Sequence, residues 1–170
     1  MNGVALEEGL LTVEDWLQAD PPEEGKLELV DGVLEMTPLA ELPHQRALFR
    51  LQEQIFGFHA RNPGFLALIS SPARVAILGK RRGREPDLAL YVQKPEHWLE
   101  ARPLVVVEVV SPGAEARDYI EKRGDYYQAE IPEYWIVDPE RRLFSALRRT
   151  DHGWDEHRFE EAGVYSTPLL

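Results

Sequence analysis

The stretch that decides the fold is Leu104-Val105-Val106-Val107-Glu108-Val109-Val110. Its β-branched residues favour a strand. A run that is apolar on both faces is typical of a central strand covered on both sides of its sheet. The exception is Glu108, because a carboxylate in such a strand is costly unless it has a partner. The sequence therefore predicts a central strand that carries one acidic side chain with a specific role.

A second acidic residue lies upstream, in the pair Pro86-Asp87, at the start of an apolar segment that predicts another strand over 87–92. Two carboxylates that converge from strand ends can share one divalent cation, and metal-assisted hydrolysis of a phosphodiester needs such a pair. The spacing leaves a structural alternative open. In that alternative Asp87 caps the turn after Pro86, and Glu108 pairs with an arginine at the end of the sheet.

The remaining pattern alternates strands with helices. Asp31-Gly32 between two alternating segments is a strong signal for a hairpin over 26–36. Helical spacing predicts a helix over 43–60, and a second one runs from about 116 to 130. A short helix is expected at 12–18, and further strands at 65–69, 74–78, 133–137, 143–147 and 154–159. This order indicates an α/β or α+β fold with a mixed central β-sheet flanked by helices.

The length of 170 residues is that of one domain. We expect a single domain over 1–170, with an N-terminal helix and hairpin at about 12–37, a core at about 43–139 and a C-terminal hairpin at about 140–165. The chain has no cysteine, which excludes disulfides and thiolate metal sites. No apolar run is long enough for a membrane span, and residues 1–11 contain no Lys or Arg, so a cytoplasmic protein is expected.

The charge distribution bears on nucleic-acid binding. The formal net charge of −11 argues against a protein that coats nucleic acid by bulk attraction. Four cations nevertheless lie within five residues, and we expect them to form a loop tip that contacts a DNA backbone: Lys80, Arg81, Arg82 and Arg84. The alternative is a solvated loop without a partner, which is what charge runs usually are.

Lys122 is a candidate for electrostatic support of the two acids. On a helical wheel the inward arc of the helix over 116–130 is defined by Tyr119, Ile120, Tyr126 and Tyr127, with Lys122 at its edge. Lys122 could then reach the end of the neighbouring strand and stabilise developing negative charge. Arg123 lies nearer the middle of the arc and competes for this role. The alternative for both is a long side chain that extends to solvent.

Two further residues are candidates from the N-terminal half. Glu28 lies in the predicted hairpin and could be another acidic ligand, or it could simply face solvent. His44 opens the helix over 43–60 and could bind phosphate or transfer protons, or it could be exposed. Ser111 lacks the flanking glycines of a nucleophile elbow, and the other histidines lack zinc-binding spacing, so serine-hydrolase and zinc chemistry are not indicated.

Taken in order, several short motifs resemble the Uma family of bacterial proteins with proposed endonuclease activity. The resemblance covers about residues 10–160. Its fragments are Leu27-Glu28-Leu29-Val30-Asp31-Gly32, Pro43-His44-Gln45, Pro86-Asp87, Val107-Glu108-Val109-Val110-Ser111-Pro112, Arg117-Asp118 with Glu121-Lys122 and Tyr126, and Pro132 to Pro139.

That family is similar to the PD-(D/E)XK restriction-endonuclease-like superfamily, and the resemblance implies its core fold and Mg²⁺-dependent DNA cleavage. Asp87 and Glu108 would be metal ligands, and the carbonyl of Val109 a third. The superfamily's lysine would stand at position 110, which is Val110 here, so Lys122 would take its place. Glu28 would supply an additional acid.

The sequence thus predicts a DNA endonuclease that hydrolyses phosphodiester bonds with a water activated by Mg²⁺ or Mn²⁺. DNA is the expected partner, and a homo-oligomer, a dimer or larger, is expected as well. Two alternatives stay open. One is a catalytically inactive nuclease-fold interaction protein, and the other is a metal-dependent hydrolase of another phosphorylated substrate.

Overall fold

The computed structural model describes residues 9–38, 40–160 and 164–170. Its helices are α1 (Val13–Gln18), α2 (Leu42–Arg61), the 3₁₀ turn η1 (Trp98–Glu100), the π-helical turn η2 (Arg117–Glu121) and α3 (Lys122–Gln128). Its strands are β1 (Lys26–Val30), β2 (Val33–Thr37), β3 (Leu68–Ser70), β4 (Val75–Ile77), β5 (Arg82–Arg84), β6 (Leu88–Tyr91), β7 (Val105–Val109), β8 (Glu133–Asp138), β9 (Leu143–Thr150) and β10 (Gly153–Phe159).

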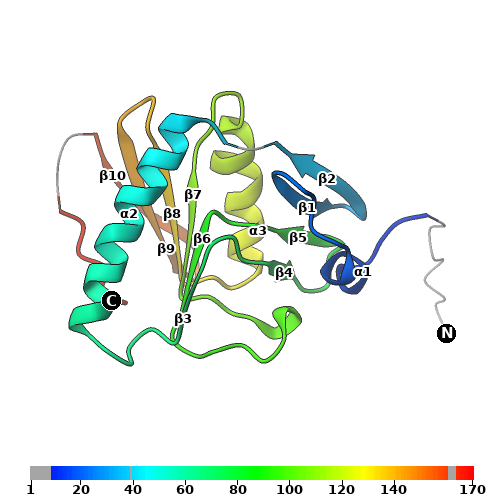
Figure 1. The fold of residues 1–170 in the computed structure, drawn as a ribbon, viewed down its shortest axis with the longest axis horizontal. Helices are drawn as coiled ribbons and strands as arrows, with labels where there is room; N and C mark the ends of the chain where they lie inside the picture. Colours follow the sequence, from blue (N-terminus) through cyan, green and yellow to red (C-terminus); the bar gives the residue numbers. More distant parts are fainter. Residues whose placement is uncertain (1–8, 39, 161–163) are drawn as a thin grey trace.

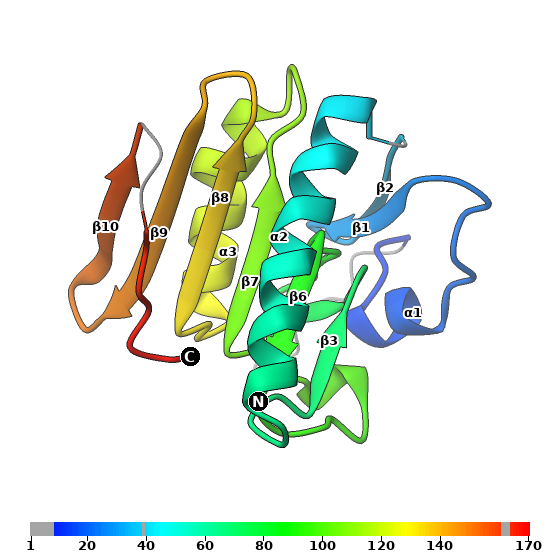
Figure 2. The ribbon, with the colours of Figure 1, turned by 60° about the vertical axis from the view of Figure 1, so that its left-hand side comes forward.

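Six strands form the main sheet in the order β10-β9-β8-β7-β6-β3. The β7–β8 pair is parallel and the other pairs are antiparallel, so the predicted mixed sheet is confirmed. Helix α2 covers one face of this sheet and α3 covers the other (Figures 1 and 2). The predicted flanking of the sheet by helices is therefore confirmed as well.

Strand β7 explains why the sheet is buried on both faces. Val105, Val107 and Val109 pack into a core that includes Leu48 and Ile55 of α2. Val106 and Val110 pack into the other core, which includes Tyr126 of α3. Successive side chains of a strand alternate between its faces, so Glu108 points to the same side as Val106. The alternation thus aims the acidic side chain of β7 at α3.

A second, antiparallel sheet has the order β2-β1-β5-β4 and was not predicted. The β1–β2 hairpin itself is confirmed, with positive φ at Asp31 and Gly32 as a type I′ turn requires. Trp16 of α1 is fully buried against this sheet and donates a hydrogen bond from Nε1 to the carbonyl of Leu27, at 2.6 Å. These contacts of Trp16 join α1 to the second sheet.

Only part of the basic segment is the loop tip that the sequence suggested, because Lys80 and Arg81 lie in the turn between β4 and β5. Arg82 to Arg84 form β5, and Gly83 pairs with Leu29 of β1 and Ala76 of β4. Gly83 lies directly beneath the ring of Trp16, where a larger residue would collide. For residues 82–84 the prediction of a loop is wrong, because β1 of the hairpin pairs with this segment and the local charge pattern does not reveal that pairing.

Two smaller differences concern element boundaries. Strand β3 is shorter than the predicted 65–69, and Phe65 packs its ring on Phe58 at the end of α2. The helix after β7 begins with the π turn η2, which shifts its periodicity. As a result Ile120 is exposed rather than inward-facing, whereas Tyr126 is buried as predicted. In the described parts of the chain, no helix has the length and apolar character needed to cross a bilayer.

Candidate active site

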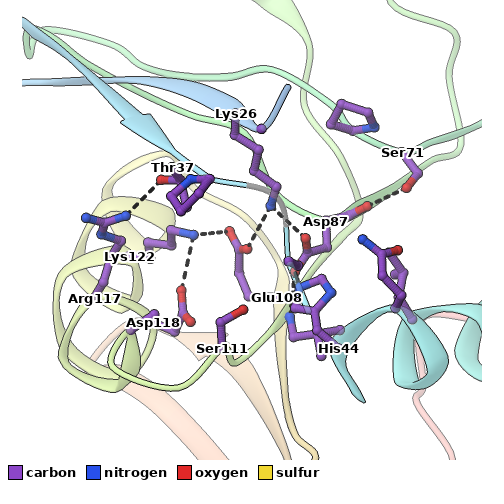
Figure 3. A pocket seen from close by; sticks show the side chains of 18 residues that line it. Lys26, Thr37, His44, Ser71, Asp87, Glu108, Ser111, Arg117, Asp118 and Lys122 are labelled. Carbon is purple, nitrogen blue, oxygen red and sulfur yellow. Dashed lines mark hydrogen bonds and ion pairs between the residues drawn. The ribbon is translucent and has the colours of Figure 1, made fainter. Parts of the chain in front are cut away.

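A cavity of about 270 Å³ lies where the second sheet meets the ends of β6 and β7. Figure 3 shows its polar side chains converging from separate elements. Lys26 comes from β1, His44 from the first turn of α2, Asp87 from the residue before β6, and Glu108 from β7. Asp118 and Lys122 complete the group from η2 and α3. The main sheet, the hairpin and the helices on both faces of the main sheet therefore each contribute to one site.

Asp87 is buried and uses its two oxygens differently. Oδ2 accepts a hydrogen bond from the backbone amide of Val109 at 2.7 Å and lies 3.0 Å from Nε2 of His44. Oδ1 faces the ammonium of Lys26 at 2.7 Å. Burial alone would raise the pKa of Asp87, but the charge of Lys26 and the bond to His44 outweigh it and hold the pKa well below its usual range. Asp87 is therefore an ionised, fixed carboxylate.

Glu108 divides its oxygens in the same way. Oε1 accepts a hydrogen bond from the hydroxyl of Tyr126 at 2.6 Å and lies 3.0 Å from Nζ of Lys122. Oε2 faces Nζ of Lys26 at 3.6 Å. Burial raises the pKa of Glu108 to about 7, although the ammonium groups of Lys122 and Lys26 oppose the shift. Glu108 can thus gain or lose a proton near neutral pH.

Lys26 joins the two acids, and sequence reasoning missed it. Its Nζ lies between Oδ1 of Asp87 and Oε2 of Glu108, with its side chain 21% exposed. Burial would lower the pKa of Lys26, but Glu108 and Asp87 together raise it, so the group stays charged. A signal was present in the sequence: strand alternation places Lys26 on the same face of β1 as Glu28.

Lys122 is buried and contacts three carboxylates, of Glu108, Asp118 and Glu28, at 3.0, 3.1 and 3.5 Å. Burial would lower the pKa of Lys122, but these acids raise it well above its usual range. The structure thus brings together Lys122, Glu108 and Glu28, as the sequence suggested. Asp118 was missed, although its position four residues before Lys122 on a helix could have indicated it.

Arg84 does not offer a charge to a DNA backbone, which corrects that part of the sequence prediction. It is fully buried, with Nη1 2.9 Å from Glu28 and Nη2 2.7 Å from Asp125. Arg82 pairs with Asp31 and Asp125 at 2.7 and 2.9 Å. These two arginines tie β5 to β1, its turn and α3, because a buried guanidinium requires acidic partners.

The other predicted DNA contacts have different surroundings. His44 is buried beside Asp87 and lines the cavity, so the alternative of an exposed residue is wrong. Its role in phosphate binding or proton transfer stays a prediction. Lys80 is exposed, and Lys80 and Arg81 border a separate cavity with Thr12, Leu78 and Leu99. Contact of Lys80 and Arg81 with DNA stays a prediction.

The contacts of Val109 and Arg123 bear on the roles that the sequence suggested for them. Val109 meets Asp87 through its amide, and the role of its carbonyl as a ligand stays a prediction. Arg123 does not compete with Lys122, because its guanidinium pairs with Glu156 of β10 at 2.8 Å. Neither alternative proposed for the two acids holds. Asp87 pairs with Lys26 and is more than the cap of a turn. Glu108 pairs with Lys26 and Lys122, and not with an arginine.

The cavity holds two of the oxygen donors that a magnesium ion would need. Mg²⁺ prefers oxygen ligands and commonly uses one or two protein carboxylates together with water and phosphate. Asp87 and Glu108 each present one oxygen to a common position that holds the ammonium of Lys26. Among the described residues there is no group of three or more His, Cys, Asp or Glu side chains arranged to hold a metal. The arrangement fits a site with two carboxylates and open positions, and a cation there would have to displace Lys26.

Comparison with known proteins identifies the family. A solved structure described as a putative nuclease belonging to DUF820, from Anabaena variabilis ATCC 29413, is similar with a TM-score of 0.75. The match covers 94% of this chain and 90% of that chain at 15% sequence identity, so it shows a shared fold. The search of curated proteins finds no significant match. The family Uma2, described as "Putative restriction endonuclease", matches residues 13–170, and the chain therefore belongs to the Uma2 family.

Proposed function

We propose that this protein is a Mg²⁺-dependent nuclease that hydrolyses phosphodiester bonds within DNA. The observation that carries the proposal is the convergence of Asp87 and Glu108 on one cation position at a cavity wall, with Lys122 directly behind Glu108. The description of its family and that of its structural neighbour agree with a nuclease.

In this proposal Asp87 and Glu108 hold the metal, with the carbonyl of Val109 as a further ligand. When bound, Mg²⁺ polarises a phosphate and lowers the pKa of a water molecule that attacks phosphorus. The Oδ1 and Oε2 atoms are the two that remain for it, because the other oxygen of each acid is already engaged with the protein. The protein thus fixes the orientation of both ligands before any cation arrives.

The neighbouring side chains have supporting roles. The hydroxyl of Tyr126 and the ammonium of Lys122 hold Oε1 of Glu108, and the amide of Val109 holds Oδ2 of Asp87. Lys122 remains charged in its acidic surroundings and supplies the positive charge that the apolar Val110 cannot. Its role is to offset the negative charge that develops on the phosphate.

The test is a cleavage assay on supercoiled plasmid and on single-stranded DNA, with Mg²⁺, with Mn²⁺ and with a chelator. We expect metal-dependent nicking by the natural protein and a loss of at least about a hundredfold in Asp87→Asn and Glu108→Gln. Asp155→Asn is the matched control, since Asp155 is an exposed acid of β10 that pairs with Arg148. Equal cleavage by all four proteins would refute the proposed site.

A second candidate follows from Lys26. Its ammonium takes the position that a metal would need, which favours a nuclease-fold protein without catalysis, used for interaction alone. The two candidates differ in their metal response. Natural protein that neither binds Mn²⁺ nor cleaves DNA would support the inactive form, whereas metal binding without DNA cleavage would point to another phosphorylated substrate.

A further inference from the structure

Helix α2 carries an apolar stripe on the side that faces away from the sheet, and none of the residues that the structure describes covers it. Leu42, Phe49 and Phe56 are 69, 60 and 52% exposed, although each is a large apolar side chain. They are spaced seven residues apart, which places them along one side of the helix. The buried side of the same helix is made by other residues, His44, Leu48 and Ile55. The stripe is therefore additional to the core-facing surface of α2.

We propose that this stripe is the interface through which two copies of the chain form an antiparallel dimer, α2 against α2. A helix of 20 residues presents a contact line about 30 Å long. A two-fold axis at Phe49 would place Phe49 against its symmetry mate, and would place Leu42 of one copy against Phe56 of the other. All three large apolar side chains then find apolar partners in a closed, self-complementary contact.

The charges beside the stripe select both the partner and the direction. Arg46 and Glu53 lie seven residues apart along the same flank of the stripe, and both are exposed. In the described parts of the chain neither forms an ion pair. An antiparallel arrangement brings Arg46 of one copy close to Glu53 of the other, twice by symmetry. A parallel arrangement would not bring these opposite charges together. A second copy of this chain is thus the partner whose charges complement the surface.

This inference is independent of the proposed nuclease activity, because the stripe lies on the face of α2 opposite to His44 and the cavity. The two functions of the helix are therefore separable by mutation. Substitutions at Phe49 should change the oligomeric state and leave the contact between His44 and Asp87 intact.

The first test is the mass of the full chain in solution, measured by sedimentation over a range of concentrations. We expect a reversible dimer whose dissociation constant rises at least a hundredfold in Phe49→Glu. Ile120→Glu is the matched control, because Ile120 is a 71% exposed apolar residue of η2 outside the stripe, and this variant should still dimerise. A monomer at all concentrations, or a dimer that Phe49→Glu leaves unchanged, would overturn the proposal.

A second test exchanges the charges of Arg46 and Glu53 and leaves the apolar residues of the stripe unchanged. Arg46→Glu and Glu53→Arg should each weaken the dimer, and the double variant should restore it, because the pair is only exchanged between the helices. If the loss of dimerisation free energy in the double variant equals the sum of the losses in the two single variants, the antiparallel pairing is wrong.

Crosslinking determines the direction, since the chain has no cysteine of its own. Oxidised Phe49→Cys should form a covalent dimer, whereas Ile120→Cys should not. Leu42→Cys should crosslink to Phe56→Cys in a mixture and poorly to itself. Efficient self-crosslinking of Leu42→Cys would instead show a parallel contact.

A membrane surface is the alternative partner of the stripe. If the natural protein is a monomer that binds anionic vesicles, and Phe49→Glu abolishes this binding, the stripe binds a membrane and the dimer proposal is wrong.

Discussion

Asp87 and Glu108 each direct one carboxylate oxygen at the same ammonium nitrogen, Nζ of Lys26, at 2.7 and 3.6 Å. The remaining oxygen of each acid is held by the protein, through Val109 and His44 for Asp87 and through Tyr126 and Lys122 for Glu108. Two oriented carboxylate oxygens therefore surround one ammonium group, and this contact joins β1 of the second sheet to the start of β6 and to β7 of the main one.

The first prediction concerns pH. Burial raises the pKa of Glu108 to about 7, so this carboxyl holds a proton below that pH and a metal must displace it. Affinity for Mn²⁺ should fall by up to about tenfold for each unit of pH below about 7, and level off above it. Calorimetric titrations between pH 5.5 and 8 measure this. In Glu108→Gln the binding should be weak and nearly independent of pH, and a flat profile in the natural protein would contradict the assignment.

The second prediction concerns Lys26. Its ammonium must leave the shared position when a divalent cation enters, so Lys26→Met should bind Mn²⁺ about tenfold more tightly or better. The variant also removes the cation that Asp87 and Glu108 share, which lowers the stability of the metal-free protein and makes its melting temperature strongly dependent on metal. Lys80→Met, at an exposed site, serves as the control. Weaker binding in Lys26→Met would show that Lys26 does not compete with the metal.

The third prediction concerns the stability contributed by Lys122. Lys122→Met leaves Glu108, Asp118 and Glu28 buried without their shared cation, and should lower the free energy of unfolding by about 3 kcal/mol or more at pH 8. Arg123, the next residue, forms a partly exposed ion pair with Glu156. Arg123→Met removes this pair and should lower the free energy of unfolding by about 1 kcal/mol or less. Urea denaturation of both variants measures the difference. Similar losses would mean that Lys122 is not the cation on which these acids depend.

The sequence already predicted most of the main sheet, for physical reasons that are local. The apolar run around Glu108 predicted a buried strand, and Asp31-Gly32 predicted the hairpin, because each signal depends on short-range backbone preference and alternation. The helix over 43–60 was equally clear from its spacing, and it is present as α2.

The second sheet could not be predicted in the same way. Strand β5 is a basic segment whose side chains are neutralised by Glu28, Asp31 and Asp125, all distant in sequence. Its burial is therefore a property of the assembled fold. Lys26 was missed for a related reason: its role depends on where β1 lies against β6 and β7, and strand alternation alone gives only its face.

The fourth prediction tests how β5 is held. A Cβ at Gly83 would collide with the ring of Trp16, so Gly83→Ala should lower the free energy of unfolding by about 2 kcal/mol. Gly124 lies in α3 with open space around it, and Gly124→Ala should instead raise that free energy by up to about 1 kcal/mol through helix propensity. In thermal unfolding, the melting temperature should fall in Gly83→Ala and rise in Gly124→Ala. A neutral Gly83→Ala would argue against the close contact with Trp16.

The most direct test of the central claim is a calorimetric titration of Mn²⁺ into the natural protein and three variants at pH 8. Asp87→Asn and Glu108→Gln should each weaken binding at least about a hundredfold, because each removes one of two ligands to the same ion. Asp155→Asn should bind like the natural protein. We expect one high-affinity ion per chain that requires both acids. Undiminished binding in either carboxylate variant would show that Asp87 and Glu108 do not share a metal.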